Sequence, residues 1–303
     1  CWSLRAEAHL PPLAEVSGQY VPESRVPEAG GLRSQVSSYD AAANVPIQLG
    51  ERTFLVPGAQ YHVDSVSYSQ EPAAFTPVGA LHSVSFPVLF AQQLSDTWTL
   101  SFRVWPGAAG DFEALDSGAL QVGGLAMATW IPSERVTAGA GLIATYGFGE
   151  LLALPSVYLD VRPNDWFRIE SSLPAFASAI VTDDDRVEVG VLADVNGNEY
   201  SVRAPSFRNT YPCRPQATDD VATPADETVR DARGCVDRLA YSVIAAGGVA
   251  RVRLFSSLWL TGFVGHTLFR RYELKSAEGE AVPGGKIDLP NGVAVRAGLV
   301  FRV

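Results

Sequence analysis

The sequence has little charge, a single methionine and no long hydrophobic run. Charged residues make up 18% of its 303 residues, whereas soluble domains usually have about 25%. The formal net charge is −10, so we do not expect nucleic acid as a partner, because that needs a basic surface. No stretch of about 18 consecutive apolar residues occurs, so we expect no transmembrane helix. Because the only methionine is Met127, we expect that a leader was removed or that the chain is a fragment.

Cysteine is also scarce, with Cys1, Cys213 and Cys235 alone. Cys213 and Cys235 flank a polar stretch rich in proline, aspartate and threonine, which predicts a disulfide formed in an oxidising compartment; two free thiols are the alternative. We expect no metal site there, because no further cysteine or histidine lies nearby to complete a ligand set. Cys1 is either the lipid-modified residue of a bacterial lipoprotein or the point where the chain was cut.

One apolar stretch, Ala250–Leu274, is as long as a membrane-spanning helix but contains four arginines. From Val252 on, every second residue belongs to an apolar face. The opposite face carries Arg251 and Arg253 together with hydroxyl and aromatic side chains. A period of two is typical of a β-strand, so the stretch is predicted to be one long strand. Its far end, Arg270 to Tyr272, is expected to rise above a membrane.

The same alternation recurs along the chain, and two kinds of connection separate the strands that it predicts. The clearest further strands are Trp98–Trp105, Ser156–Arg162, Trp166–Leu173, Arg186–Asn196 and Val293–Val303. Tight turns are predicted at Gly50, Ser95, Pro132, Pro163, Asp183 and Gly247. Longer polar connections are predicted near 22–32, 70–79, 107–118, 149–154, 205–234 and 275–291. About fourteen strands result, from Ala14–Val21 to the C-terminus, and twelve remain possible.

Short turns at one end and long loops at the other favour an all-β fold, a transmembrane antiparallel up-and-down β-barrel of about 12–14 strands. A closed sheet pairs every backbone group in hydrocarbon, so that strands can be apolar toward lipid and charged toward the lumen. The alternative is a soluble or lipid-anchored ligand-binding β-barrel or sandwich, whose apolar faces point inward. We expect a periplasmic segment at 1–12 and the barrel at 13–303, with a long extracellular loop at 205–234.

The run from Leu154 to Val202 resembles the central segment of an uncharacterised family of bacterial outer-membrane β-barrel proteins. The similar features are two Leu-Pro steps, at Leu154-Pro155 and Leu173-Pro174, and Trp166 just after a short turn. The resemblance implies a barrel fold and an outer-membrane location for the chain from about residue 13 on. It implies no activity and no catalytic residue.

Ten charged residues are expected to point into the lumen of the predicted barrel. Either they line a pore that selects solutes by charge, or they form an ion-pair network that closes the lumen. They are Asp160, Arg162, Arg168, Glu170, Glu188, Asp194, Arg251, Arg253, Arg296 and Arg302.

Other chemistry-bearing residues predict little. His82 and His266 are expected to face lipid near strand ends, and no spacing specifies a serine–histidine triad. Five aromatic residues suit interfacial girdles, with a ligand-stacking platform as the alternative; they are Trp98, Trp105, Trp130, Trp166 and Tyr146. Three aspartates at 183–185 are interpreted as a solvated turn rather than a cation site.

The sequence therefore predicts an integral outer-membrane barrel without enzymatic activity, cofactor or metal. It would be a narrow channel for small solutes or a structural barrel. Its expected partners are outer-membrane lipids, the barrel-assembly machinery during insertion, and small solutes. The alternative function is that of a membrane-embedded lipid hydrolase, which would place a serine hydroxyl next to His82 or His266.

Overall fold

The computed structural model describes residues 11–26, 32–68, 79–113, 117–183, 186–203, 236–277 and 279–302. These residues form one antiparallel sheet of seventeen strand segments and a single 3₁₀ turn, η2 (Ser117–Ala119). The segments are β1 (Ala14–Val26), β2 (Leu32–Asn44), β3 (Ile47–Gly50), β4 (Thr53–Tyr68), β5 (Ala80–Ser85), β6 (Val88–Gln93), β7 (Trp98–Gly110), β8 (Leu120–Ser133), β9 (Val136–Thr145), β10 (Leu152–Asn164), β11 (Phe167–Leu173), β12 (Phe176–Asp183), β13 (Val187–Ser201), β14 (Arg238–Arg253), β15 (Leu258–Lys275), β16 (Ala281–Asp288) and β17 (Val293–Phe301).

The described segments make fourteen crossings, because three strands are each interrupted once. The pairs β2 and β3, β5 and β6, and β16 and β17 each continue along the same neighbour, β4, β7 and β15 respectively. β1 pairs with β17 from Ala14–Phe301 to Tyr20–Val295, which closes the sheet into a barrel. The predicted fold class, a barrel of 12–14 antiparallel strands, is therefore confirmed.

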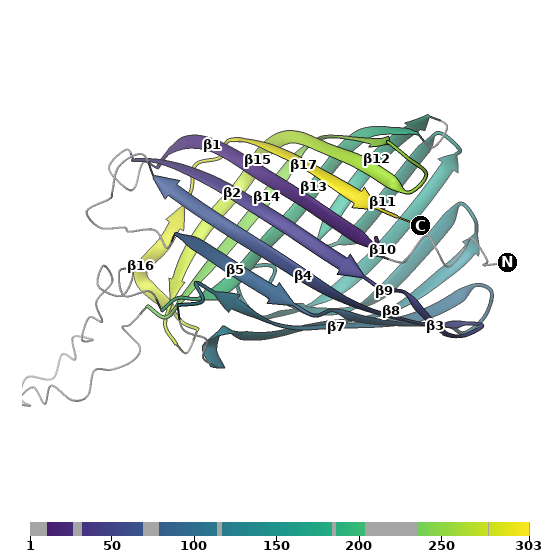
Figure 1. Ribbon diagram of the computed structural model, residues 1–303, viewed down its shortest axis with the longest axis horizontal. Coiled ribbons are helices and arrows are strands. Elements are labelled where there is room, and N and C mark those ends of the chain that lie inside the picture. The colour runs from purple at the N-terminus through teal and green to yellow at the C-terminus, as the bar shows by residue number, and fades with distance from the viewer. Residues whose placement is uncertain are drawn as a thin grey trace, which may run out of the picture.

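Both chain ends lie at one end of the barrel, as an even number of crossings requires. The backbone N–H of Leu13 donates to the carbonyl of Phe301 over 2.9 Å. Five tight connections lie at this end together with the bend after β14, and we call it the short-turn end. The opposite end carries the longer connections and is called the long-loop end. Figure 1 shows the chain ends on the right and the long-loop end on the left.

The outer face of the barrel is a continuous apolar belt, as the alternation predicts. The side chains of Val191, Val264 and Leu142 are 61%, 61% and 68% exposed. Exposed apolar side chains recur on almost every strand, which would be an aggregation hazard in water. In hydrocarbon the same belt is solvated and the closed sheet leaves few backbone groups unpaired. The barrel is thus of the transmembrane kind.

The predicted turn at Gly247 is wrong, and so is the single strand over Ala250–Leu274. β14 continues through Gly247 to Arg253, the chain turns at 254–257, and β15 begins at Leu258. The turn was concealed because Leu254 and Phe255 at its start are apolar and because four residues preserve the alternation of faces. Gly247 serves close strand packing instead: a Cβ there would lie 2.3 Å from the Cα of Gly265 on β15.

A β-bulge in β15 reverses the facing of its last residues. Ala245 of β14 pairs with Thr267 and Ile244 pairs with Phe269, so that Leu268 is an extra residue. Beyond it Arg270 points inward and is 1% exposed. Arg271 points outward and its Nε donates to Asp288 over 2.7 Å. Of the two arginines that the sequence places at the rim, one is therefore buried in the barrel.

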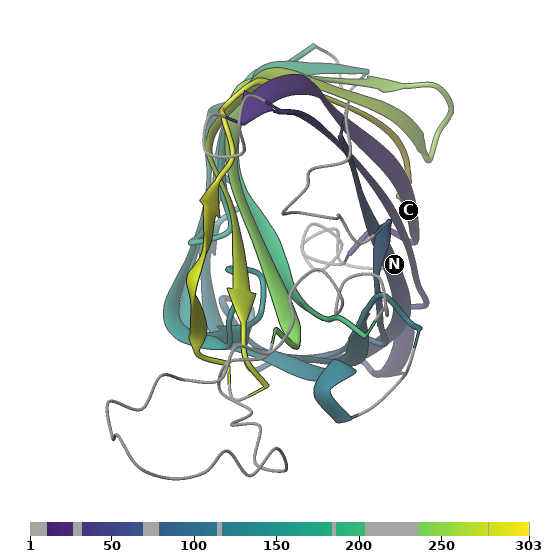
Figure 2. The ribbon, with the colours of Figure 1, turned by 90° about the vertical axis from the view of Figure 1, so that its left-hand side faces the viewer.

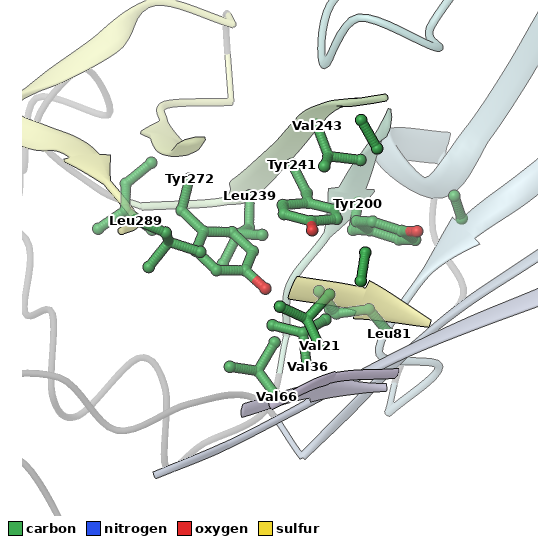
Figure 3. Close-up of a cluster of buried hydrophobic side chains, with 14 of the residues drawn as sticks. Val21, Val36, Val66, Leu81, Tyr200, Leu239, Tyr241, Val243, Tyr272 and Leu289 are labelled. Atoms are coloured by element: carbon green, nitrogen blue, oxygen red, sulfur yellow. The ribbon is translucent and has the colours of Figure 1, made fainter. Parts of the chain in front are cut away.

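The lumen is filled at the long-loop end by an apolar core, which we call the plug. Its buried side chains come mainly from strands in the two stretches β1 to β7 and β13 to β17 and include Val21, Val36, Val66, Leu81, Tyr200, Leu239, Tyr241 and Tyr272 (Figure 3). β13 lies across the interior here: Ser201 pairs with Gly110 of β7, a strand that is far away in the wall. Figure 2, seen from the long-loop end, shows a green strand inside the ring.

Several predictions fall outside the described residues. These are the disulfide between Cys213 and Cys235, the identity of Cys1, almost all of the segment 1–12, the loop 205–234, and the second and third aspartates at 183–185.

Candidate functional site: the lumen

The lumen contains a cavity of about 620 Å³ toward the short-turn end, called the lower chamber. Seven of the ten charged residues predicted to face inward line it: Arg162, Arg168, Glu170, Asp194, Arg251, Arg296 and Arg302. Asp160 and Glu188 do not line it but bind lining arginines. The lining contains five arginines and two carboxylates, so the wall of this chamber carries an excess of positive charge.

Most of these charges are paired across neighbouring strands. Arg168 on β11 donates to both oxygens of Asp160 on β10, over 2.9 and 3.0 Å, and lies 3.1 Å from Glu170. Arg251 of β14 binds Glu188 of β13 over 2.9 Å. The pairs join β10 to β11 and β13 to β14: Glu188 and Arg251 are directly opposed, whereas Arg168 is the diagonal neighbour of Asp160, two residues from its register partner Glu170.

Arg296 connects two distant parts of the lumen wall. Its Nη1 lies 2.8 Å from Asp194 of β13, while its Nε and Nη2 donate to the side-chain oxygen of Gln19 on β1 over 3.1 and 2.8 Å. Because Asp194 and Gln19 lie on strands well separated in the barrel wall, the guanidinium bridges the lumen and narrows it.

Two arginines of the predicted set lie against an aromatic ring instead of a carboxylate. The guanidinium carbons of Arg253 and Arg302 lie 5.6 and 5.9 Å from the ring centre of Trp259. Trp259 faces inward and is buried. Cation–π contact stabilises a guanidinium without neutralising it, so these two residues can still bind a solute carboxylate or phosphate.

A second cavity of about 430 Å³, the middle chamber, adjoins the lower one and shares Asn196 and Arg296 with it. Here the nitrogens of His62 lie 2.6 Å from Asp40 and 3.0 Å from Asp64. Asp64 also accepts hydrogen bonds from Ser38 and from Tyr200, over 2.5 and 2.7 Å. This network ties β2 and β4 to the part of β13 that crosses the interior.

The network at His62 was not predicted, although the sequence contains a signal for it. Ser38, Asp40, His62 and Asp64 all fall on the inward positions of β2 and β4. The apolar/polar alternation of β2 and β4 therefore predicts that these four side chains face the lumen. That Asp64 meets Tyr200, 136 residues later, has no sequence signal.

A third cavity of about 170 Å³, the upper chamber, shares Gly197 and Asn198 with the middle one. Trp105 and Tyr146 line it, so the prediction that these two belong to an interfacial girdle is wrong. Trp105 faces inward because it follows Arg103 by two residues on the inner face of β7. Trp98, Trp130 and Trp166 are 46%, 45% and 57% exposed, and Trp98 pairs with Trp130 on the outer wall.

Above the chambers, buried charges reinforce the plug. Glu199 accepts hydrogen bonds from Arg238 over 2.7 Å and from Lys275 over 3.0 Å. Lys275 also donates to the carbonyl of Gly149 in the β9–β10 connection over 2.9 Å. Removing one member of such a network leaves an uncompensated buried charge, so the arrangement holds the ends of β13, β14 and β15 together.

The two histidines that a lipid hydrolase would use have other partners. His82 Nδ1 lies 2.7 Å from the hydroxyl of Tyr61, and its ring stacks on Phe112 with the ring centres 5.5 Å apart. His266 Nδ1 lies 2.8 Å from the carbonyl of Thr267. In the described part of the chain, neither histidine has a serine hydroxyl as a hydrogen-bond partner.

Two further features are absent from the described residues. They contain no cluster of three or more histidine, cysteine, aspartate or glutamate side chains suited to holding a metal ion. They also contain no helix of the length and apolarity needed to cross a bilayer.

Comparison with solved structures returns distant barrels. The NanC porin is 9% identical, with 96% of this chain and 100% of that chain covered and a TM-score of 0.39. A FadL homologue of Pseudomonas aeruginosa is 10% identical, with 95% and 88% covered and a TM-score of 0.42. LpxR from Salmonella typhimurium is 8% identical, with 96% and 100% covered and a TM-score of 0.35.

These likenesses carry no information on a solute or an activity. No curated protein matches the chain. One family does match, over residues 5–213, more than half of the sequence, and it is described as a domain of unknown function (DUF6268). The chain belongs to this family.

Proposed function

We propose that the protein is an outer-membrane channel for small anionic solutes, held closed at its long-loop end. The carrying observation is the series of three adjoining chambers that runs through the lumen from the short-turn end to the plug. A barrel that served only as a scaffold could fill this space with apolar side chains. The arginines of the lower chamber, above all Arg302, would attract and bind anions, together with Arg253 beside Trp259.

An outer-membrane location is supported by the apolar belt and the closed sheet, which suit a bilayer, and by a barrel architecture that is typical of outer membranes. Outer-membrane lipids would be its permanent partners, and the barrel-assembly machinery its partner during insertion. Small solutes would be transient ligands. The long-loop end would face outward and the chain ends would lie in the periplasm.

A non-enzymatic role is supported by the partners of His82 and His266, which leave neither imidazole next to a serine hydroxyl. The second candidate function is a structural barrel. It is favoured by the number of inward charges that bind each other, including Arg168 with Asp160 and Arg251 with Glu188.

Swelling of proteoliposomes in solutions of small solutes distinguishes the two. The test variant replaces residues 200–239 by Asn-Gly, since Glu199 and Ala240 are directly opposed in β13 and β14 and a two-residue turn fits such a pair. It deletes four plug side chains, Tyr200, Val202, Val236 and Leu239, and keeps the chambers. We expect several-fold faster swelling than for the wild type, and faster swelling in acetate than in an uncharged solute of similar size.

Charge selection is tested in the same background. Arg302→Gln should reduce the preference for acetate, because it removes a guanidinium that forms no ion pair with a carboxylate among the described residues and lies against Trp259 instead. The matched control is Arg135→Gln, which removes an exposed arginine paired with Asp165 outside the lumen. Wild-type swelling rates in the shortened variant would support the structural barrel, and equal effects of both arginine substitutions would contradict selection in the lumen.

A further inference from the structure

The barrel wall has a gap at the long-loop end between β10 and β13. The hairpin between them, β11 and β12, has strands of only 7 and 8 residues, whereas β10 and β13 have 13 and 15. β10 pairs with β11 from Val157 on, and no described strand pairs with residues 152–156 on that side. β13 pairs with β12 as far as Asp194, and Val195 donates to Ala175 at the hairpin tip. Above this level no described strand lies between the two edges, because β13 turns into the lumen, where Ser201 pairs with Gly110 of β7.

The gap lies at the depth of the bilayer. Seven residues rising about 3.3 Å each, on a strand tilted by roughly 40°, reach a height of about 18 Å, whereas the apolar band of such barrels is about 25 Å tall. Trp166, exposed in the turn below β11, marks the lower interface. Beside the gap, Leu142, Leu151 and Leu173 are 68%, 55% and 50% exposed, so the apolar belt continues past the hairpin tip on this side.

Unpaired strand edges do not occur facing hydrocarbon, unless protein covers them or they line a water-filled cavity. At this gap a loop covers the edge of β13, and the same edge borders the cavities of the lumen. The β9–β10 connection, Tyr146–Glu150, folds over the edge of β13, and we call it the strap. A Cβ on Gly197 of β13 would lie 2.9 Å from the carbonyl oxygen of Gly147, so the two backbones touch.

The strap is held by few bonds. Ser242 Oγ donates to the carbonyl of Phe148 over 2.8 Å, and Lys275 Nζ donates to the carbonyl of Gly149 over 2.9 Å. Gly149 has a φ of +82°, which allows the sharp turn on which this fit depends. In the described residues no backbone hydrogen bond joins the strap to β13 or β14.

Behind the gap lies the lumen. The lower chamber reaches the hairpin tip at Ala175 and Phe176 and the edge of β13 at Asn196. The upper chamber reaches the strap itself at Tyr146 and Gly147, and the same edge at Gly197 and Asn198. Movement of the strap alone would therefore connect the arginine-lined lumen with the hydrocarbon of the bilayer.

We propose that this gap is a lateral portal, closed by the strap, through which an amphipathic anion with an apolar tail, such as an alkyl carboxylate, exchanges between lumen and bilayer. The charge of the ligand class rests on the proposed function, since it derives from the lower-chamber arginines. The apolar tail follows from Leu142 and Leu151 on the β10 side of the gap and from Leu173 and Phe176 at its lower edge.

The test measures access to the chamber behind the strap from the lipid phase. Cys1, Cys213 and Cys235 are replaced by serine, and Asn198→Cys places a thiol in the upper chamber. Proteoliposomes are then labelled with N-phenylmaleimide, which partitions into bilayers, or with a sulfonated maleimide, which does not. The strap variant replaces residues 146–151 by Asn-Gly between Thr145 and Leu152, which are directly opposed.

We expect the strap variant to react several-fold faster with N-phenylmaleimide and at an unchanged rate with the sulfonated reagent. Ser242→Ala, which removes one strap bond, should have a smaller effect in the same direction. Its control Ser101→Ala, which removes a serine-to-backbone bond between β7 and β8, should have none. An unchanged rate with N-phenylmaleimide, or acceleration of the sulfonated reagent alone, would overturn the portal.

The ligand class is tested in the strap variant by protection of the thiol that Asn198→Cys introduces. Dodecanoate should slow labelling more than dodecanol does, and Arg302→Gln should reduce that difference. Equal protection by the two compounds would refute the anionic head group, whereas the portal itself is judged by the labelling rates. The portal and the proposed channel can fail separately, because swelling reports passage through the plug and labelling reports passage through the wall.

Discussion

At the scale of single residues, the most unusual group in the barrel is Arg270. Its side chain is buried among the apolar residues of the plug. Nη1 donates to the carbonyl of Pro290 over 3.1 Å, but Nε and Nη2 have no hydrogen-bond partner within the described structure. A buried charge without a counter-charge is strongly unfavourable. These unpaired N–H groups make the plug less stable than apolar packing alone would make it, which would favour opening of the proposed channel.

Replacing Arg270 by methionine should accordingly stabilise the barrel. We expect the midpoint of thermal unfolding, followed by heat-modified mobility in gels, to rise for Arg270→Met, because a side chain of similar volume replaces an unpaired charge. Arg270→Lys keeps the charge and should not raise it. A clear fall of the midpoint in the methionine variant would mean that the guanidinium has a stabilising partner.

At the same scale, the facing of the charged residues could be predicted and their partners could not. Strict alternation places Asp160, Arg168 and Arg251 on the inner face, where the structure has them. It fails after Leu268, because a bulge adds a residue that is itself apolar and leaves no mark in the pattern. The cross-strand neighbours of each charge depend on register, which the sequence does not encode locally.

At the scale of elements, glycines set how closely β14 and β15 approach. A Cβ on Gly247 would lie 2.3 Å from Gly265 Cα and 2.4 Å from the carbonyl oxygen of Val264. These are backbone atoms, so they cannot rotate away. On the same strand pair, a Cβ on Gly262 would find its nearest neighbour, the carbonyl oxygen of Ala250, at 4.0 Å.

Gly247→Ala should therefore lower the stability of the folded barrel by about 1–3 kcal/mol, the usual cost of overpacking. Gly262→Ala is the matched control and should be neutral or slightly stabilising, since alanine restricts the unfolded chain. The measurement is urea unfolding in detergent micelles, followed by tryptophan fluorescence. Equal effects of the two substitutions would contradict the close approach of the strands at Gly247.

The same glycine explains why one turn was misplaced. Two consecutive glycines at 247 and 248 are a strong turn signal, whereas the real turn at 254–257 contains no glycine, proline, asparagine or aspartate, and its two serines are a weaker signal. Gly247 is needed for the close packing of β14 against β15 and not for a turn. The other tight turns, such as those after Gly50 and at Pro163, carry polar residues with turn propensity and could be located from the sequence.

At the scale of the whole molecule, the barrel follows from the alternation and from the even number of strands that brings both chain ends together. The plug does not. Val21, Val36, Val66 and Leu81 are single apolar residues at inward positions on four strands, and nothing local shows that they meet. The crossing of the lumen by β13 rests on contacts such as Ser201 with Gly110, which join segments about a third of the chain apart.

The closed channel is tested most directly by single-channel conductance in planar bilayers. The account predicts that the wild-type barrel inserts but remains mostly closed, with rare brief openings. It predicts stable ohmic steps with anion selectivity when residues 200–239 are replaced by Asn-Gly and the plug is thereby opened. Stable steps of the same size in both proteins, or none in either after verified insertion, would contradict it.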